Sequence, residues 1–383
     1  MKLKLALIIS LLLLLIVVSC SKDPKVTDMS DMEVLANYIN IPNEPFNYSA
    51  QVLPEFFNNQ FVKIQDNTPV GNAVTDWGAT LGRVLFYDKN LSINNTISCA
   101  SCHIQAHGFT DTVQFSKGFM GGKTKRHSMS LINAKYYISG RFFWDERAAS
   151  LEDQVLMPIQ DVVEMGMNLD TLVRKLNRLP YYPILFKYAF GSSNISSDKI
   201  SKALAQFVRS IVSYQSKYDV GRAQVNAKED DFPNFTVDEN LGKSIFMTNA
   251  DINCSGCHTT DVFIMDNPRN NGLTIDNGDK GIYVHTLKAE DEGKFKAPSL
   301  KNVGLRKRFM HDGSFNSLRD VVEHYNTQLA SNPNLDSHLK DLSGNPRRMN
   351  LLPHEIQALV RFLETLTDDK IVKEIKFSSP FKY

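Results

Sequence analysis

The chain has 383 residues, with 43 basic and 42 acidic side chains, so its charge is nearly balanced. Removal of a leader that carries Lys2 and Lys4 leaves 41 basic against 42 acidic side chains, which argues against a nucleic-acid-binding protein. The roughly 360 residues after the leader are enough for two domains, each with its own hydrophobic core.

The chain begins with the pattern of an export signal. Two lysines precede an apolar run at 5–18, and the run ends at Cys20. This run is short for a membrane span, which indicates a signal peptide, with an uncleaved anchor helix as the alternative. A cysteine in this place resembles a bacterial lipoprotein signal, in which the cysteine is lipidated and becomes the mature N-terminus. We therefore expect a signal at 1–20 and, because the next stretch is polar and lacks a clear period, a tether at 21–49.

Two short motifs contain all the remaining cysteines: SCASCH at 98–103 and NCSGCH at 253–258. A redox dithiol needs no trailing histidine, and cysteine pairs that share a structural zinc usually lie closer together. In Cys-x-x-Cys-His both thiols can add to the vinyl groups of a porphyrin while the adjacent imidazole reaches the iron. The motifs therefore predict two covalently bound c-type haems. The attachment residues would be Cys99, Cys102, Cys254 and Cys257, and the proximal ligands would be His103 and His258.

The sequence around these motifs is duplicated. Leu81-Gly82-Arg83 precedes the first motif as Leu241-Gly242-Lys243 precedes the second. Downstream, RFFWDERAASLEDQV at 141–155 aligns without a gap with RFMHDGSFNSLRDVV at 308–322. Each half thus has a helix, a haem attachment motif, a long connecting stretch and a second duplicated segment, at 141–155 or 308–322. We call these the returning segments, and each could cover the other face of its haem.

Apolar residues repeat at intervals of three and four in two segments, which predicts amphipathic helices. One spans 200–211, with Asp198 as the expected N-cap. The other spans 356–366, with Pro353 suited to its first turn.

A third helix is indicated between the two halves, because Thr236 and Glu239 form a capping-box pattern ahead of the second motif. Polar residues are concentrated from Tyr214 to Asn234, which favours a boundary there. We expect an all-α fold of two tandem cytochrome c-like domains, at 50–220 and 221–383.

Several stretches in order resemble the bacterial di-haem cytochrome c peroxidases, above all their MauG-type branch. They are CASCHIQAHGFTD at 99–111, SLINA at 130–134, FFWDERAASLEDQV at 142–155, PIQDVVEMG at 158–166, APSLKNVG at 297–304 and FMHDGSFNSLRDVVEHYN at 309–326. The resemblance runs from about residue 50 to the C-terminus. It implies reduction of hydrogen peroxide to water at the N-terminal haem, with electrons from a small cytochrome c or cupredoxin-type donor entering at the C-terminal haem. The alternatives are MauG-like oxidation of a protein or organic substrate by stored oxidising equivalents, and a non-catalytic electron carrier with both irons closed by two protein ligands.

The resemblance also implies roles near the first haem. Reductively activated members have a distal histidine in the loop that reads QFSKGFMGGKTKR here, which contains none. We therefore expect an open sixth position at the first iron, with His127 as an alternative ligand. Glu164 matches the glutamate that moves the proton in O–O cleavage, and Gln154 matches the glutamine that orients the ligand, unless both are ordinary surface residues. Trp144 matches the tryptophan between the cofactors, a position that also suits a core residue.

At the second iron, the second ligand lies 14 residues after the histidine of an F-x-H-x-G stretch in similar enzymes. Counting from His311 reaches Tyr325, where the MauG-type branch has tyrosine. We expect Tyr325 to be this ligand, with Met310 and His324 as alternatives.

Related enzymes also hold calcium between the domains through an asparagine and backbone carbonyls. His127 replaces that asparagine, and Arg306, Lys307 and Arg308 add positive charge, so calcium is not favoured. The leader and the resemblance together imply export to the periplasmic side, with a lipid anchor at Cys20 and the outer membrane preferred. The resemblance is compatible with a homodimer.

Overall fold

The computed structural model describes residues 29–249, 251–252, 254–264, 267–276 and 278–382, so the leader lies outside the described residues. Within these ranges all regular secondary structure is helical, and the only β-type pairs are isolated bridges. The predicted all-α class is confirmed. None of the described helices has both the length and the apolarity to cross a membrane.

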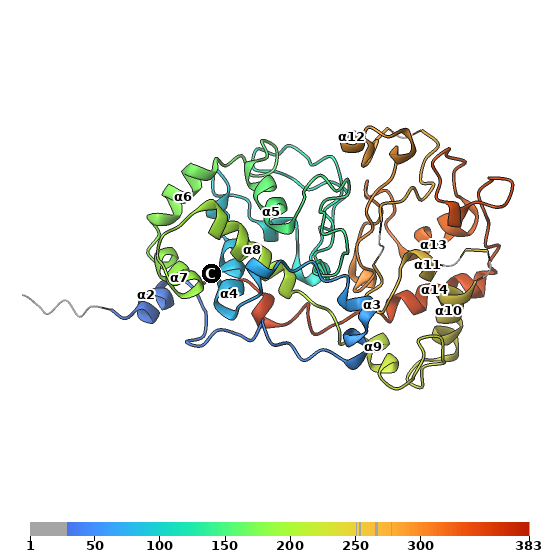
Figure 1. Cartoon of the computed structure of the whole chain (residues 1–383), viewed down its shortest axis with the longest axis horizontal. Coiled ribbons are helices and arrows are strands. Elements are labelled where there is room, and N and C mark those ends of the chain that lie inside the picture. Colours follow the sequence, from blue (N-terminus) through green and yellow to red (C-terminus); the bar gives the residue numbers. More distant parts are fainter. Residues whose placement is uncertain (1–28, 250, 253, 265–266, 277, 383) are drawn as a thin grey trace, which may run out of the picture.

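Two halves lie side by side along the long axis of the molecule (Figure 1). The helices of the first half are α2 (Asp31–Tyr38), α3 (Gln60–Lys63), α4 (Asp76–Tyr87), α5 (Leu151–Gln160), α6 (Leu169–Asn177), α7 (Tyr181–Phe190) and α8 (Ser197–Ser210). Those of the second half are α9 (Lys217–Arg222), α10 (Val237–Thr248), α11 (Cys254–Cys257), α12 (Tyr283–Thr286), α13 (Leu318–Thr327) and α14 (Pro353–Glu364).

Each half has its own hydrophobic core around one pair of helices, α4 with α8 and α10 with α14. The duplicated glycines permit both pairings. A Cβ on Gly82 would lie 2.0 Å from Ala203 O, and a Cβ on Gly242 would lie 2.0 Å from Ala358 O. Only glycine allows such a close approach of two helices, which explains why the Leu-Gly-basic triplet occurs twice.

The ends of the predicted helices are mostly confirmed. Thr236 and Glu239 form the expected capping box, and Pro353 opens α14. The cap predicted for α8 was wrong, because the side chain of Ser196 accepts the hydrogen bond from the backbone N–H of Lys199. Asp198 instead lies in the first turn, where its carboxylate suits the positive end of the helix dipole.

The expected tether at 21–49 is shorter than predicted, because α2 lies within it. Ser30 and Glu33 cap this helix reciprocally, and Leu35 and Ile39 are buried in the core of the first half. Leu35 lies within α2, whereas Ile39 follows the helix in an extended conformation and forms a β-bridge with Phe381.

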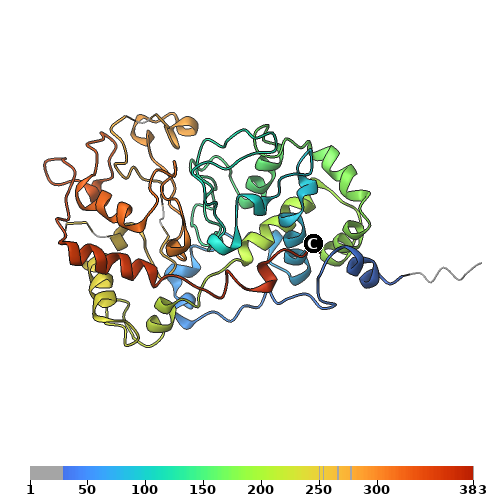
Figure 2. The same cartoon turned by 180° about the vertical axis from the view of Figure 1, so that it is seen from behind.

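The end of the chain also departs from the predicted division at 221–383. After α14 the chain returns to the first half, as Figure 2 shows for the red segment. Ile371 and Phe377 are buried in the core of that half, and the Gln105 side chain donates to the carbonyls of Ile371 and Glu374, each over 3.0 Å. The last residues of the chain therefore complete the first domain.

A third cluster of buried side chains joins the halves. It contains Phe56, Phe57, Val62, Tyr136, Tyr137, Val212, Val262 and Ile264. Because these residues come from both sides of residue 220, the halves share a continuous apolar contact and are fixed relative to each other.

Candidate functional site

The first Cys-x-x-Cys-His motif forms a tight turn after α4. A 3₁₀ turn spans Cys99–Ser101, and the backbone N–H of His103 donates to Cys99 O over 3.0 Å. Both thiols are free and half-buried, and burial raises the pKa of Cys99 to about 12 and that of Cys102 to about 11. Two unpaired thiols on one turn are what attachment to the two vinyl groups of a haem requires.

His103 is oriented by a backbone carbonyl. Its Nδ1 lies 3.0 Å from Phe109 O, so Nδ1 carries the proton and Nε2 keeps its lone pair for a metal. Gly108 and Phe109 have positive φ angles of 68° and 56°, which turns this carbonyl toward the ring. Burial lowers the pKa of His103 and keeps the ring neutral. The residues present therefore fit an axial haem ligand.

Three further residues line the same cavity as His103: Gln154 and Pro158 from α5, and Glu164 from the turn that follows it. Burial raises the pKa of Glu164 to about 7, and the nearby Asp161 carboxylate adds to the rise. A carboxyl group with this pKa can both accept and return a proton near neutral pH.

The loop without a distal histidine, residues 116–124, is a hairpin that packs on the Glu164 turn. The backbone N–H of Phe119 donates to Glu164 O over 3.0 Å. Gly118 lies so close to this turn that a Cβ would be 1.7 Å from Val163 O. The hairpin therefore fixes the backbone that carries Glu164.

His127 is buried, and its ring nitrogens face protein groups. Nε2 lies 3.1 Å from Thr110 Oγ1, and Nδ1 lies 3.1 Å from Val113 O and 3.2 Å from Gln114 O. With both nitrogens engaged in this way, the ring has no lone pair left over for the first iron.

The second motif repeats the first. α11 carries Cys254 and Cys257, which form no disulfide within the described residues, and the backbone N–H of His258 donates to Cys254 O over 2.9 Å. Burial lowers the pKa of His258 to about 4, so this imidazole is neutral. The turn fits a second covalent haem as the first turn does.

A buried guanidinium lines the second cavity. Arg306 Nη2 donates to the carbonyls of Ser299 and Lys301, whereas Nε has no hydrogen-bond partner. Burial lowers the pKa of Arg306 to about 10. A buried cation with an unsatisfied donor is costly unless an anion lies beside it, and a haem propionate is such an anion.

The duplication extends to the backbone of the returning segments. Phe143 and Met310, which align, have positive φ angles of 70° and 69°. Continuing the alignment, the eighth residue of α5 is Pro158 and the eighth residue of α13 is Tyr325. Pro158 lines the first cavity and Tyr325 lines the second, so equivalent positions face the two haem sites.

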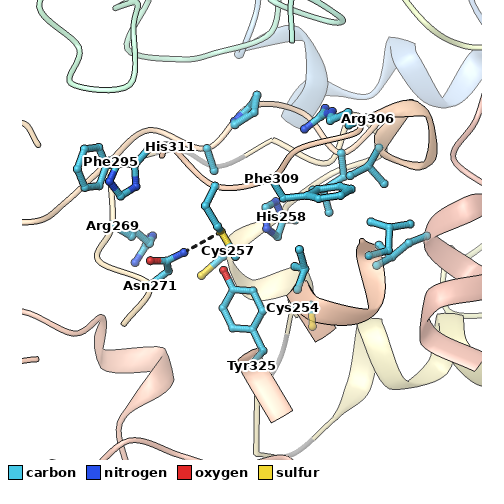
Figure 3. Close-up of a pocket in the computed structure, with 18 of the residues that line it drawn as sticks. Cys254, Cys257, His258, Arg269, Asn271, Phe295, Arg306, Phe309, His311 and Tyr325 are labelled. Carbon is cyan, nitrogen blue, oxygen red and sulfur yellow. Dashed lines mark hydrogen bonds between the residues drawn. The ribbon is translucent and has the colours of Figure 1, made fainter. Parts of the chain in front are cut away.

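The three candidate ligands of the second iron all contact Asn271. Figure 3 shows the Tyr325 hydroxyl pointing toward the side chain of Asn271. Asn271 Nδ2 donates to Met310 Sδ over 3.3 Å, and its side chain also hydrogen-bonds Tyr325. His324 does not line this cavity, because its Nε2 donates to Asn271 O over 2.9 Å. Tyr325 and Met310 thus remain candidates on geometric grounds, and His324 does not.

Trp144 lines both the cavity that contains His258 and a cavity of about 930 Å³ that contains His103. Its Nε1 donates to His127 O over 2.8 Å, which fixes the indole. The ring of His311 meets Trp144 edge-on at 6.5 Å and stacks on Phe295 at 3.6 Å. His311 therefore packs against Trp144 and Phe295 on the wall of the cavity that contains His258.

Two residues that line these cavities, Pro158 and Asn271, were not identified from the sequence. Pro158 could have been found by extending the duplicated alignment along the helix. Asn271 could not, because it lies in the long connecting stretch after the second motif, where no periodicity or repeat marks it.

Comparison with known proteins agrees with this geometry. The family model of the di-haem cytochrome c peroxidases matches residues 77–226 of this chain. The methylamine utilization protein MauG of Methylorubrum extorquens is 33% identical over 300 residues, which are 78% of this chain and 80% of that protein. The cytochrome c551 peroxidase of Pseudomonas aeruginosa is 29% identical over 311 residues, or 76% and 86% of the two chains.

Solved structures show the same likeness. The crystal structure of a MauG-like protein associated with microbial copper homeostasis has a TM-score of 0.71 at 29% identity and covers 82% of this chain and 95% of that one. The diheme peroxidase BthA from Burkholderia thailandensis shares the fold, with a TM-score of 0.65 at 21% identity and coverage of 83% and 93%.

Proposed function

Because the chain belongs to the di-haem cytochrome c peroxidase family, whose members carry two c-type haems, we propose that it reduces hydrogen peroxide to water in the first cavity. The observation that carries this proposal is the placement of Gln154 and Glu164 on the wall of the cavity that contains His103. A haem held by Cys99, Cys102 and His103 supplies the iron and the electrons for cleavage of the O–O bond.

Glu164 is the acid–base group of the proposed reaction. Its carboxylate takes the proton from the nearer peroxide oxygen and returns it to the leaving hydroxyl, so that one peroxide, two electrons and two protons give two waters. The Gln154 amide is placed to donate a hydrogen bond that orients the peroxide. The hairpin at 116–124 supports Glu164 from behind, so the site needs no rearrangement of this loop before it can react.

Trp144 is proposed to carry electrons between the two haems. Trp144 lines both the cavity that contains His258 and the larger cavity of about 930 Å³ that contains His103, and its hydrogen bond to His127 O holds its ring in one orientation. A fixed π-system between two cofactors shortens each electron-transfer step without a moving part.

Tyr325 is proposed as the second ligand of the second iron, with Met310 as the alternative. The equivalence with Pro158 supports Tyr325, because each residue lines the cavity beside its own Cys-x-x-Cys-His motif, and Asn271 already donates a hydrogen bond to the Met310 sulfur. A phenolate is anionic and stabilises higher oxidation states of iron, whereas a thioether raises the reduction potential.

A second function depends on which residue is the second ligand of the second iron. If Tyr325 holds the second iron, oxidising equivalents can be shared across Trp144 and used on a protein or organic substrate, as in MauG-like chemistry. A non-catalytic carrier is disfavoured because both ring nitrogens of His127 face protein groups and the loop at 116–124 has no histidine.

An electron paramagnetic resonance spectrum of the oxidised holoprotein tests the proposal, because it distinguishes a haem iron with an open sixth position from one with two protein ligands. We expect a high-spin signal from the first haem and a reaction with peroxide that needs no prior reduction of the second. A wholly low-spin protein that stays inert until half-reduced would contradict the proposal and would implicate His127.

The electron donor is proposed to be a small cytochrome c or a cupredoxin-type protein that binds on the periplasmic side of a bacterial membrane.

The lipoprotein-like signal suggests anchoring through lipidated Cys20, with the outer membrane preferred and no other contact with lipid. Cys20→Ser should move the protein from the membrane fraction to the soluble fraction with both haems intact. A wild-type protein that keeps its leader would favour an anchor helix instead. A homodimer is compatible with the family and would be detected by light scattering.

Calcium is not part of this proposal. The carbonyls of Ser299 and Lys301 accept hydrogen bonds from the Arg306 guanidinium, so a cationic side chain already occupies oxygen atoms that a hard cation would need.

A further inference from the structure

A row of three tyrosines runs from the interior of the first half to its surface. The ring centroids of Tyr182 and Tyr181 are 4.6 Å apart, and those of Tyr181 and Tyr38 are 5.4 Å apart. Tyr182 and Tyr181 are buried, whereas Tyr38 is 43% exposed. The first two lie on α7 and the last on α2, and these helices contact each other at the end of the molecule remote from the second half (Figure 1).

A buried carboxylate receives both inner hydroxyl groups. Asp88 Oδ2 accepts from Tyr182 over 2.6 Å and from Tyr181 over 3.0 Å, and only 3% of Asp88 is exposed. The other oxygen caps the 3₁₀ turn that begins at Lys89. Asp88 forms no ion pair within the described residues, and its hydrogen-bond donors are the two phenols together with the backbone and side-chain N–H groups of Asn90. Such a carboxylate is well placed to take a proton from either phenol.

The inner end of the row lies near the first haem attachment site. Cys99 packs against the hydrophobic core of the first half, the same cluster of buried side chains that contains Tyr181 and Tyr182. When Cys99 is joined to a haem vinyl group, its sulfur extends the cofactor toward Tyr182.

We propose that Tyr182, Tyr181 and Tyr38 carry oxidising equivalents from the first haem site to the surface, where Tyr38 oxidises phenolic one-electron donors. This inference rests on the proposed reaction with peroxide. It adds a second route for oxidising equivalents, which ends on the face away from Trp144 and the second haem. Small phenols can then be oxidised at Tyr38 without entering the first cavity.

Each step balances. Tyr182 gives one electron to the oxidised haem site and its hydroxyl proton to Asp88, and it recovers both when Tyr181 is oxidised in turn. Tyr181 gives its own proton to Asp88, which has returned the first proton to Tyr182. Tyr38 then gives one electron to Tyr181 and its exposed hydroxyl proton to solvent, and Asp88 returns a proton to Tyr181. A phenolic donor restores Tyr38 by giving one electron and one proton, and the two protons released to solvent for each peroxide equal the two that its reduction consumes. Two phenols and one peroxide thus yield two phenoxyl radicals and two waters.

A nitroso spin trap tests the proposal. Holoprotein is treated with peroxide and the trap in the absence of a reductant, and trapped sites are mapped by mass spectrometry. We expect adducts on Tyr38. Tyr182→Phe and Asp88→Asn should each lower the Tyr38 adduct by about tenfold or more. In both variants, stopped-flow absorbance should show that the first haem still reacts with peroxide at the wild-type rate.

A tyrosine on the same helix provides the matched control. Tyr188 is 37% exposed and stacks on Trp77 at 4.5 Å, without contact with Asp88, so Tyr188→Phe should leave the Tyr38 adduct unchanged. Peroxide-reactive protein without an adduct on Tyr38, or with equal adduct in Tyr182→Phe, would overturn the inference and leave the proposed function standing. A haem spectrum that does not respond to peroxide would overturn both.

Discussion

Pro158 of α5 and Tyr325 of α13 are equivalent residues in two copies of one structural unit. Each is the eighth residue of a helix capped by a serine, Ser150 in the first copy and Ser317 in the second. Each lines the cavity of its own haem attachment motif. Proline has no atom that can bind iron and tyrosine has a phenol oxygen, so one exchange at one helical position gives the two cavities different chemistry.

The first prediction concerns this difference. Tyr325→Phe should shift the optical spectrum of the second haem and raise its reduction potential, because an anionic ligand is lost. Met310→Leu should change neither measurement appreciably. If the two substitutions behave in the opposite way, Met310 is the ligand.

The second prediction concerns Asn271, whose amide donates to the Met310 sulfur and hydrogen-bonds Tyr325. A hydrogen bond to a phenolate oxygen withdraws electron density from it and weakens its donation to iron. Asn271→Leu should therefore lower the reduction potential of the second haem, in the direction opposite to Tyr325→Phe. Potentiometric titration of the three proteins measures both signs, and a shift of the same sign in both variants would exclude this role.

The third prediction concerns Glu164, whose pKa is raised to about 7 by burial and by Asp161. Because only the ionised carboxylate can accept the peroxide proton, the rate of O–O cleavage should rise with pH through about 7. Glu164→Gln should slow this step by about 100-fold and remove the pH dependence.

Asp161→Asn is the matched variant for Glu164. It removes a negative charge that raises the pKa of Glu164, so the rising limb of the rate profile should move to lower pH while the maximum rate is retained. Stopped-flow kinetics across pH 5 to 9 measures both variants. An unchanged profile in Glu164→Gln would show that another group moves the proton.

The fourth prediction concerns cofactor content. Intact-mass spectrometry of the purified protein should show two covalent haems, and the double variant Cys254→Ala, Cys257→Ala should retain one. Zinc in place of haem, without a Soret absorption band, would contradict the whole assignment.

The fifth prediction concerns the returning end of the chain. Phe377 is buried against Tyr48, Phe109 and Phe207 of the first half. Phe377→Ala should destabilise that half by about 3–5 kcal/mol, because it removes a large buried side chain and leaves a cavity. Ile375→Ala, at a side chain that is 69% exposed, should change stability by less than about 0.5 kcal/mol. Thermal unfolding followed by haem absorbance distinguishes the two.

The sequence allowed prediction of features that repeat or follow a period. The duplicated triplets containing Gly82 and Gly242 marked one helix in each half, and the structure explains the repeated glycine, because each lets a second helix pack closely. The capping box at Thr236 was found because its two residues have a fixed spacing. The haem attachment turns were predictable for the same reason, since covalent chemistry sets their spacing.

Features that depend on distant packing were not predictable. Helix α2 has eight residues and Leu35 is the one that it buries, which is too little to show a period. Ser196 and Asp198 were both acceptable caps, and only the backbone geometry selects the serine. The tail that carries Phe377 reads as part of the second domain, because the sequence does not reveal which half it packs against.

The return of the chain end to the first half has a consequence for biogenesis. Residues 371–381 are synthesised after the rest of the first half and after both Cys-x-x-Cys-His motifs, so the first half lacks Ile371 and Phe377 until the second half has been made. During that interval the core of the first half is incomplete. We therefore expect the first domain to close only after both haem attachment motifs have been synthesised.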